Sequence, residues 1–165
     1  MGYSKYIKRK SKKLTIEFTP KTVHTNPLFF HYNSMNLSSL LSKIREELLN
    51  TEGNICYICG EKSANLFLYE NWEYDDLNHQ MALKSLHHIC EMCHKVKHLD
   101  FWFFTTYGRE QLKKLKINKV DLIKHYCKVN DCNISEFGED WTKSLETWTK
   151  RNMIQWDKNF GKYKL

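Results

Sequence analysis

The sequence has no long run of apolar residues. No stretch approaches the roughly 18 to 20 apolar residues that a membrane span needs. The first thirty residues are basic and mixed and lack the apolar core of a secretory signal, and Tyr6 stands where myristoylation of Gly2 would need Ser or Thr. We therefore expect a cytoplasmic protein that is not secreted and has no membrane partner.

The chain also has no internal repeat, and it is short. Its 165 residues, set against roughly 150 per domain, exclude tandem arrays and large multidomain enzymes. With 41% hydrophobic and 14% aromatic residues the chain can bury a core, which argues against global disorder. We predict a basic flexible arm over residues 1–13 and a single domain over residues 14–165.

The positive charge lies toward the two ends of the chain. The formal net charge is +7, with net +6 over residues 1–25, net −3 over residues 56–108 and net +5 over residues 109–165. Basic arms bind nucleic acid because Lys and Arg beside phosphates release condensed counterions, although a Lys-rich tail can also be no more than a solubilising surface. The candidate phosphate contacts in the arm are Lys8, Arg9, Lys10, Lys12 and Lys13.

The hydrophobic pattern predicts an α+β chain. Period-two alternation over residues 14–18 predicts an N-terminal strand ended by Pro20, and helical spacing predicts a helix of about eleven residues from Leu37. Two further strands are expected over 65–69 and 81–89, joined by a polar, acidic connection, and three helices over 109–115, 119–129 and 136–151. The C-terminal part is therefore predicted to be a helical extension.

Two C-x2-C pairs, Cys56 with Cys59 and Cys90 with Cys93, lie thirty residues apart. Two residues between cysteines allow a tight turn to aim both sulfurs at one ion, so the pairs predict a tetrahedral structural zinc site. The alternatives are a pair of disulfides and a thioredoxin-like redox motif. The missing secretory signal argues against disulfides, and the presence of two pairs argues against the redox motif.

His94 and His98 follow the second cysteine pair and are four residues apart. On a helix this spacing places both on one face, as two metal ligands or two phosphate contacts require. Two histidines at this spacing usually lie on a helix surface without any function. Directly after a zinc cysteine and behind a hairpin, however, the pair indicates a functional site. Lys95 and Lys97, in the same stretch, are further candidate phosphate contacts.

The order of cysteine pair, hairpin, cysteine pair and helix, ending in CHKVKH, resembles the zinc-containing branch of the HNH nuclease family. The shared unit of that family is the ββα-metal fold. WEYDD, CEMCHKVKH, HYCKVNDC and WDKNFGKY extend the resemblance over most of residues 14–163. The resemblance implies a zinc ββα core over about 54–104 and a helical extension over about 108–155.

In active members of this family, the first strand ends in a His that activates the attacking water. One divalent ion, held partly by His residues of the helix, stabilises the developing charge. Where related sequences read His-Glu-x-Trp, this chain reads Tyr69-Glu70-Asn71-Trp72. A phenol with a pKa of about 10 is a poor substitute for an imidazole with a pKa of about 6.5. The resemblance thus implies that Tyr69 replaces the general base. Glu70, His94 and His98 would complete the catalytic positions and could hold Mg²⁺ or another divalent ion.

We therefore predict a zinc-stabilised, HNH-like protein that binds nucleic acid, DNA in preference to RNA, with cleavage weakened or lost. One alternative is an active endonuclease whose base has moved to His79, His87 or His88. Because His87 and His88 are adjacent on a predicted strand, at most one of them can face the cleft. Another alternative is an inactive scaffold that binds a protein partner.

Overall fold

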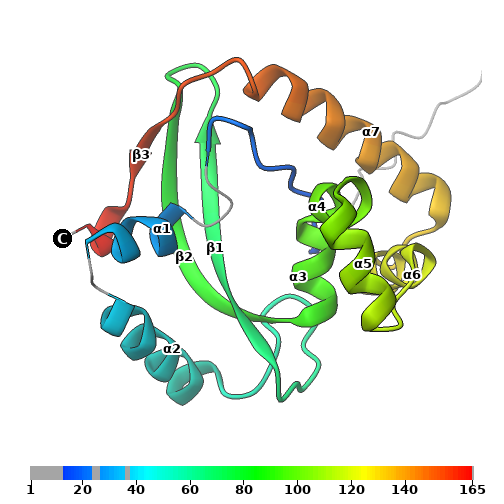
Figure 1. The fold of residues 1–165 in the computed structure, drawn as a ribbon, viewed down its shortest axis with the longest axis horizontal. Coiled ribbons are helices and arrows are strands. Elements are labelled where there is room, and N and C mark those ends of the chain that lie inside the picture. Colours follow the sequence, from blue (N-terminus) through cyan, green and yellow to red (C-terminus); the bar gives the residue numbers. More distant parts are fainter. Residues whose placement is uncertain (1–12, 24–26, 36–37, 165) are drawn as a thin grey trace, which may run out of the picture.

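The computed structural model describes residues 13–23, 27–35 and 38–164 (Figure 1). Over these residues the chain combines seven α-helices with one three-stranded sheet, which confirms the predicted α+β class. None of the helices in the described ranges is both long and apolar enough to cross a membrane.

A long hairpin forms the centre of the structure (Figure 1). β1 (Leu66–Asp75) pairs antiparallel with β2 (Gln80–Cys90), and β3 (Asp157–Asn159) adds to the start of β2 in parallel. Both hairpin strands were predicted, but β1 continues through most of the segment that we expected to be a connection. Trp72 and Tyr74 are half-buried in β1 while Glu73 and Asp75 are exposed, and this alternation extends the strand.

The helix that follows the hairpin starts without a linker. α3 (Glu91–Lys97) begins where β2 ends, and the Cys90 Sγ caps it by accepting the backbone N–H of Cys93 at 3.5 Å. α3 packs against both hairpin strands. This strand–strand–helix order places the residues of α3 beside β1.

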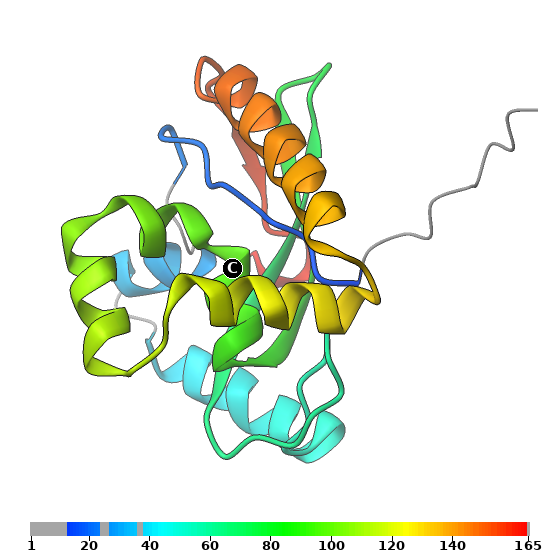
Figure 2. The ribbon, with the colours of Figure 1, turned by 90° about the vertical axis from the view of Figure 1, so that its right-hand side faces the viewer.

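Four more helices cover the same side of the hairpin. They are α4 (Leu99–Phe104), α5 (Thr106–Lys114), α6 (Lys119–Asn130) and α7 (Ile134–Arg151). The last three confirm the predicted helical extension, with ends shifted by a few residues. Asn118 and Asn133 start α6 and α7 with full capping boxes, which satisfy the free N–H groups of the first turns. Figure 2, which faces this side, shows α6 running below α7.

The other side of the hairpin carries two N-terminal helices and a short 3₁₀ helix. α1 (Pro27–Ser34) and α2 (Ser38–Glu52) pack with η1 (Gly161–Tyr163) over an apolar cluster that includes Leu28 and Leu86. α2 was predicted, whereas α1 was not. The hairpin thus separates this cluster from the larger core that contains residues of α3 to α7.

The predicted N-terminal strand is wrong. Leu14, Ile16 and Phe18 are buried in alternation with exposed neighbours, as expected, but over the described residues this segment joins no sheet. Its Glu17 N–H donates to the Lys97 carbonyl at 3.1 Å, and its Ile16 carbonyl accepts from Ser144 Oγ at 3.0 Å. The segment lies extended between α3 and α7, so the period-two pattern reflects alternate burial against helices.

Candidate metal centre and the adjoining pocket

The four cysteines of the two C-x2-C pairs converge. The Sγ atoms of Cys56, Cys59, Cys90 and Cys93 all lie within 4.8 Å of one another, and those of Cys59 and Cys90 are 3.7 Å apart. Four sulfurs at 2.3 Å from one zinc ion, at the corners of a tetrahedron, would be about 3.8 Å apart. The cluster is therefore close enough to bind a metal ion such as zinc.

Local hydrogen bonds shape the first pair into a turn. The Gly60 N–H donates to the Cys56 carbonyl and the Cys56 N–H donates to the Glu61 carbonyl, both at 2.9 Å. Gly60 has a φ of 75°, which glycine adopts without steric cost. The Tyr57 N–H donates to the His88 carbonyl at 2.9 Å and so ties this turn to β2, the strand that leads to the second pair.

The electrostatics of the cluster oppose the build-up of negative charge without a cation. Hydrogen bonds from the Cys90 and Cys93 thiols lower the pKa of Cys56. That thiolate and burial together raise the pKa of Cys90 to about 12 and also raise the pKa of Cys93. One thiolate forms readily, whereas ionisation of all four sulfurs requires a positive ion among them.

His125 lies beside this cluster and was not predicted. Its Nε2 is 3.2 Å from the Cys93 Sγ, close enough to donate a hydrogen bond to a thiolate. Lys128, one turn further along α6, pairs with Glu61 of the first cysteine turn at 2.6 Å. The sequence offers no signal for either contact, because α6 reaches the cluster only through the tertiary fold.

A pocket of about 430 Å³ lies on the α3 side of β1. It is bordered by the extended N-terminal segment, β1, α3 and α7. The residues that matter for its chemistry are Glu17, Tyr69, His94, His98, Lys143 and Arg151. Sequence reasoning did not associate Glu17, Lys143 or Arg151 with this site, because they come from opposite ends of the chain.

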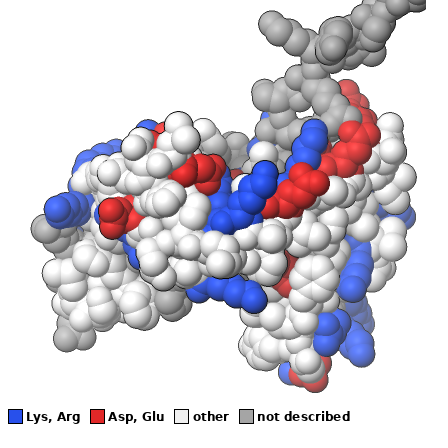
Figure 3. Space-filling model, turned by 90° about the horizontal axis from the view of Figure 1, so that it is seen from above, with Lys and Arg blue, Asp and Glu red and all other residues white. Residues whose placement is uncertain are grey.

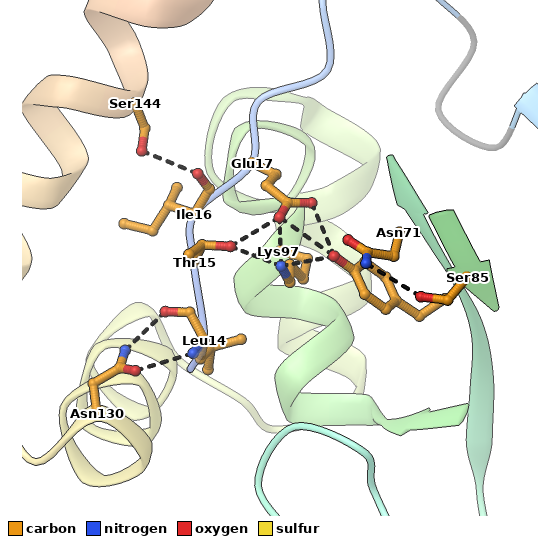
Figure 4. Close-up of polar contacts among 10 residues, drawn as sticks. Leu14, Thr15, Ile16, Glu17, Asn71, Ser85, Lys97, Asn130 and Ser144 are labelled. Carbon is orange, nitrogen blue, oxygen red and sulfur yellow. Dashed lines mark hydrogen bonds and ion pairs between the residues drawn. The ribbon is translucent and has the colours of Figure 1, made fainter. Parts of the chain in front are cut away.

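Tyr69 is held in a hydrogen-bonded network at the edge of this pocket, and Figure 4 shows Lys97, Glu17 and Thr15 of this network. Its hydroxyl accepts from Lys97 Nζ at 3.0 Å and lies 3.4 Å from both carboxylate oxygens of Glu17. Lys97 Nζ also donates to Glu17 and to Thr15. Burial and the Glu17 carboxylate raise the pKa of Tyr69 above its usual value of 10, so this phenol does not serve as a base near neutral pH.

Glu70 also borders this pocket, and its carboxylate holds the start of α1. Its Oε1 accepts from the Phe29 N–H at 3.1 Å, and its Oε2 accepts from the Leu28 N–H at 3.0 Å and from Trp72 Nε1 at 2.9 Å. Successive strand residues point to opposite faces, and this carboxylate is used at the first turn of α1. Glu70 therefore anchors α1, and its role as a metal or water ligand stays a prediction.

His94 and His98 line the same pocket, with their ring centroids 5.0 Å apart. The His94 ring stacks on Phe67 of β1 at 4.8 Å. Burial lowers the pKa of His94 to about 3 and the pKa of His98 to about 4, so both imidazoles are neutral near pH 7. Neutral imidazole is the form that binds metal ions. The Nδ1 of His98 is buried and has no hydrogen-bond partner among the described residues.

Lys95 and Lys97 are not available to phosphate, which corrects their predicted role. Each is only 3% exposed. Lys95 pairs with Glu91 at 2.9 Å and lies over the Trp102 ring, and Lys97 belongs to the Tyr69 network. A buried ammonium group needs such partners. Because both ammonium groups are buried in these contacts, neither is open to a phosphate. Of the other candidate phosphate contacts, Lys13 is exposed, whereas Lys8, Arg9, Lys10 and Lys12 lie outside the described residues.

The three histidines considered as replacement bases lie away from the pocket lining. His87 bonds Glu52 through Nδ1 at 2.7 Å and Ser85 through Nε2 at 3.0 Å. His88 is buried, and burial lowers its pKa. His79 occupies the hairpin turn. None of the three replaces Tyr69 in this conformation.

Comparisons with protein-family models, with curated proteins and with solved structures found no match to this chain.

Proposed function

We propose that this protein is a zinc-stabilised, HNH-like nucleic-acid-binding protein that does not cleave phosphodiester bonds. In this proposal Cys56, Cys59, Cys90 and Cys93 hold a structural Zn²⁺, which joins the first cysteine turn to the start of α3. The hairpin and α3 correspond to the ββα unit of the HNH family. DNA is the proposed ligand, and a net charge of +7 favours any polyanion.

The observation that carries this proposal is the environment of Tyr69. At the place where HNH nucleases have their general base, this chain has a buried phenol, 8% exposed, bonded to Lys97 and near Glu17. General-base catalysis needs a group that can accept a proton from water near the working pH. Tyr69 is not such a group, whereas His94 and His98 remain at the pocket as neutral imidazoles that could hold a divalent ion.

Plasmid nicking tests the loss of cleavage. Purified protein is incubated with supercoiled plasmid and Mg²⁺, Mn²⁺ or Ni²⁺, and the nicked form is quantified. We expect no nicking by the natural chain, because a buried phenol stands at the base position. We expect Tyr69→His to restore nicking, since it returns an imidazole to the base position, and Tyr69→His with His94→Ala to lose it again.

Two results would argue for an active enzyme instead. Nicking by the natural chain would contradict the proposal directly. If Glu17→Gln then abolished that nicking while Glu73→Gln did not, Glu17 would be the replacement base. Glu73 is the matched control because it also borders the pocket, where its carboxylate pairs with Lys84.

Nucleic-acid binding is tested separately. Retention on DNA should weaken steeply as salt rises, because the binding energy comes largely from counterion release. Retention that does not change with salt, or no retention at low salt, would contradict the proposed nucleic-acid binding. Neither result would contradict the proposed zinc site.

A further inference from the structure

The end of α5 and the turn after it carry an excess of positive charge. Arg109, Lys113, Lys114 and Lys116 face a single acid, Glu110, between residues 104 and 118. All four basic side chains are exposed. Among the described residues, no acidic side chain pairs with the three lysines. This segment therefore attracts polyanions more strongly than a surface of paired charges would.

Not every helix carries such an excess, although α6 also has three lysines against one aspartate, and one of these lysines, Lys128, pairs with Glu61. α2 and α7 each carry one more acidic than basic residue. Seen from above, the face that carries α7 shows positive and negative side chains next to one another (Figure 3). Such a mixed surface is typical of a solvated helix face. The charge at α5 and the turn after it differs because four basic side chains stand beside one acid.

Two large aromatic side chains project into solvent next to these lysines. Phe104, at the end of α4, is 60% exposed, and Tyr107, in the first turn of α5, is 62% exposed. Tyr107 and Lys114 are seven residues apart on one helix, which places them on the same face about 10 Å apart along the axis. A surface needed only for solubility would have no reason to expose two rings there.

The corner that presents these rings is well ordered. Arg109 donates to the carbonyls of Phe103 and Phe104, at 3.3 and 3.0 Å. The Thr105 side chain accepts the Gly108 N–H at 2.9 Å and donates to the Phe101 carbonyl at 2.7 Å. The backbone that carries the rings is therefore fixed before any ligand binds, which reduces the entropy lost on binding.

We propose that this basic-aromatic surface, formed by Phe104, Tyr107, Arg109, Lys113, Lys114 and Lys116, binds single-stranded nucleic acid. The exposed rings stack on unpaired bases, and the lysines contact the phosphates that connect them. In a duplex the base faces are already stacked on one another, so duplex DNA can contact only the basic side chains of this surface. This inference rests on the proposed nucleic-acid binding. It adds which surface of the protein binds the nucleic acid and that the bound nucleic acid is single-stranded.

Fluorescence anisotropy with a labelled 20-nucleotide strand and its duplex tests the inference on the full, zinc-loaded chain. We expect tighter binding of the single strand. Lys113→Ala with Lys114→Ala and Lys116→Ala should weaken binding at least 10-fold and reduce the slope of log K against log salt by about 2, from a contribution of about 0.7 per phosphate. The matched control removes Lys158, Lys162 and Lys164, three positive charges near the C-terminal end (Figure 1). It should change binding less than 3-fold.

A second variant tests the contribution of the two aromatic rings. Phe104→Ala with Tyr107→Ala should weaken single-strand binding by roughly 10-fold or more, leave duplex binding unchanged and leave the salt slope unchanged, since stacking releases no counterions. Both side chains are exposed, so the variant should keep the thermal melt of the natural chain. Natural binding strength in this variant would mean that the rings serve a protein contact, and the inference would be overturned.

The two proposals fail in different ways. If the natural chain binds no nucleic acid at low salt, the proposed function fails. If it binds, but the α5 lysine variant binds equally well while a chain with Lys8, Arg9, Lys10 and Lys12 all changed to Ala does not, the proposed function stands and the inference about α5 is wrong.

Discussion

Arg151, the last residue of α7, joins the end of that helix to the distant hairpin. Its Nε and Nη2 donate to the two carboxylate oxygens of Asp76, both at 2.7 Å. The guanidinium lies 4.2 Å from the centroid of the Tyr74 ring, and the Arg151 carbonyl accepts from Trp156 Nε1 at 3.3 Å. One side chain thus fixes the end of α7 to the hairpin turn at the edge of the pocket.

This contact predicts a pH-dependent contribution to stability. The hydrogen bonds from Arg151 lower the pKa of Asp76 below its unfolded value of about 3.9. The stabilisation should be complete above pH 4 and should disappear as the pH falls through the lower folded-state pKa. Because the Asp76 side chain is half-exposed, we expect Asp76→Asn to cost less than about 1 kcal/mol at pH 7 in urea unfolding.

The control for that measurement is Asp157→Asn. Asp157 is an exposed carboxylate of β3, and within the described part of the chain no salt bridge involves it. Its replacement should leave the stability at pH 7 unchanged. A loss at Asp76 that did not shrink as the pH fell through the range in which its carboxylate titrates would show that packing and not charge is responsible.

At the scale of elements, the corner between α4 and α5 depends on one glycine. A Cβ on Gly108 would overlap the Phe101 carbonyl oxygen and would lie 2.9 Å from both Thr105 Oγ1 and Trp102 Cα. Two of these three atoms belong to the backbone, which cannot move aside cheaply. The absence of a side chain allows the two helices to turn this tightly, and the turn in turn positions Phe104 and Tyr107.

We expect Gly108→Ala to destabilise the protein by about 1–3 kcal/mol through overpacking, although alanine favours helices more than glycine does. The matched control is Gly138→Ala in α7, where an added Cβ meets no atom within 4 Å. That substitution should stabilise the protein by up to about 1 kcal/mol. Equal effects of the two substitutions, measured by thermal unfolding, would contradict the predicted crowding at α4–α5.

At the scale of the whole molecule, the cysteine cluster lies where the first cysteine turn meets β2, α3 and α6. The first cysteine turn reaches β2 through the Tyr57 N–H and reaches α6 through Glu61 and Lys128. His125 brings α6 to the Cys93 sulfur. A metal ion at this point would therefore link the turn, α3 and α6 at once.

Removal of the metal should for this reason unfold the centre of the molecule. We expect Cys93→Ser, or treatment with a strong chelator, to abolish bound zinc and the cooperative thermal melt, because metal binding supplies folding free energy in such small units. Cys132→Ser, outside the cluster, should retain both. Zinc content by elemental analysis and unfolding by circular dichroism provide the measurement. A Cys93→Ser protein that melts cooperatively would refute the structural role.

Much of the fold could be predicted because the signals are local. The helices over 119–130 and 134–151 follow from apolar spacing and from asparagine caps, and the hairpin follows from alternating burial. α1 was missed because Glu70 of β1, more than forty residues later, binds the N–H groups of its first turn. The N-terminal segment was misjudged because alternate burial against two helices has the same period as a strand.

The sequence by itself determined the α+β class, the helical extension and the spacing that aims the two sulfurs of each cysteine pair in one direction, since each depends on neighbours in the chain. Only the tertiary structure decided that Tyr69 is bonded to Lys97 beside Glu17, that Glu70 anchors α1, and that Lys95 and Lys97 are buried. The reason is physical: burial and charge pairing depend on groups that come together only when distant segments pack.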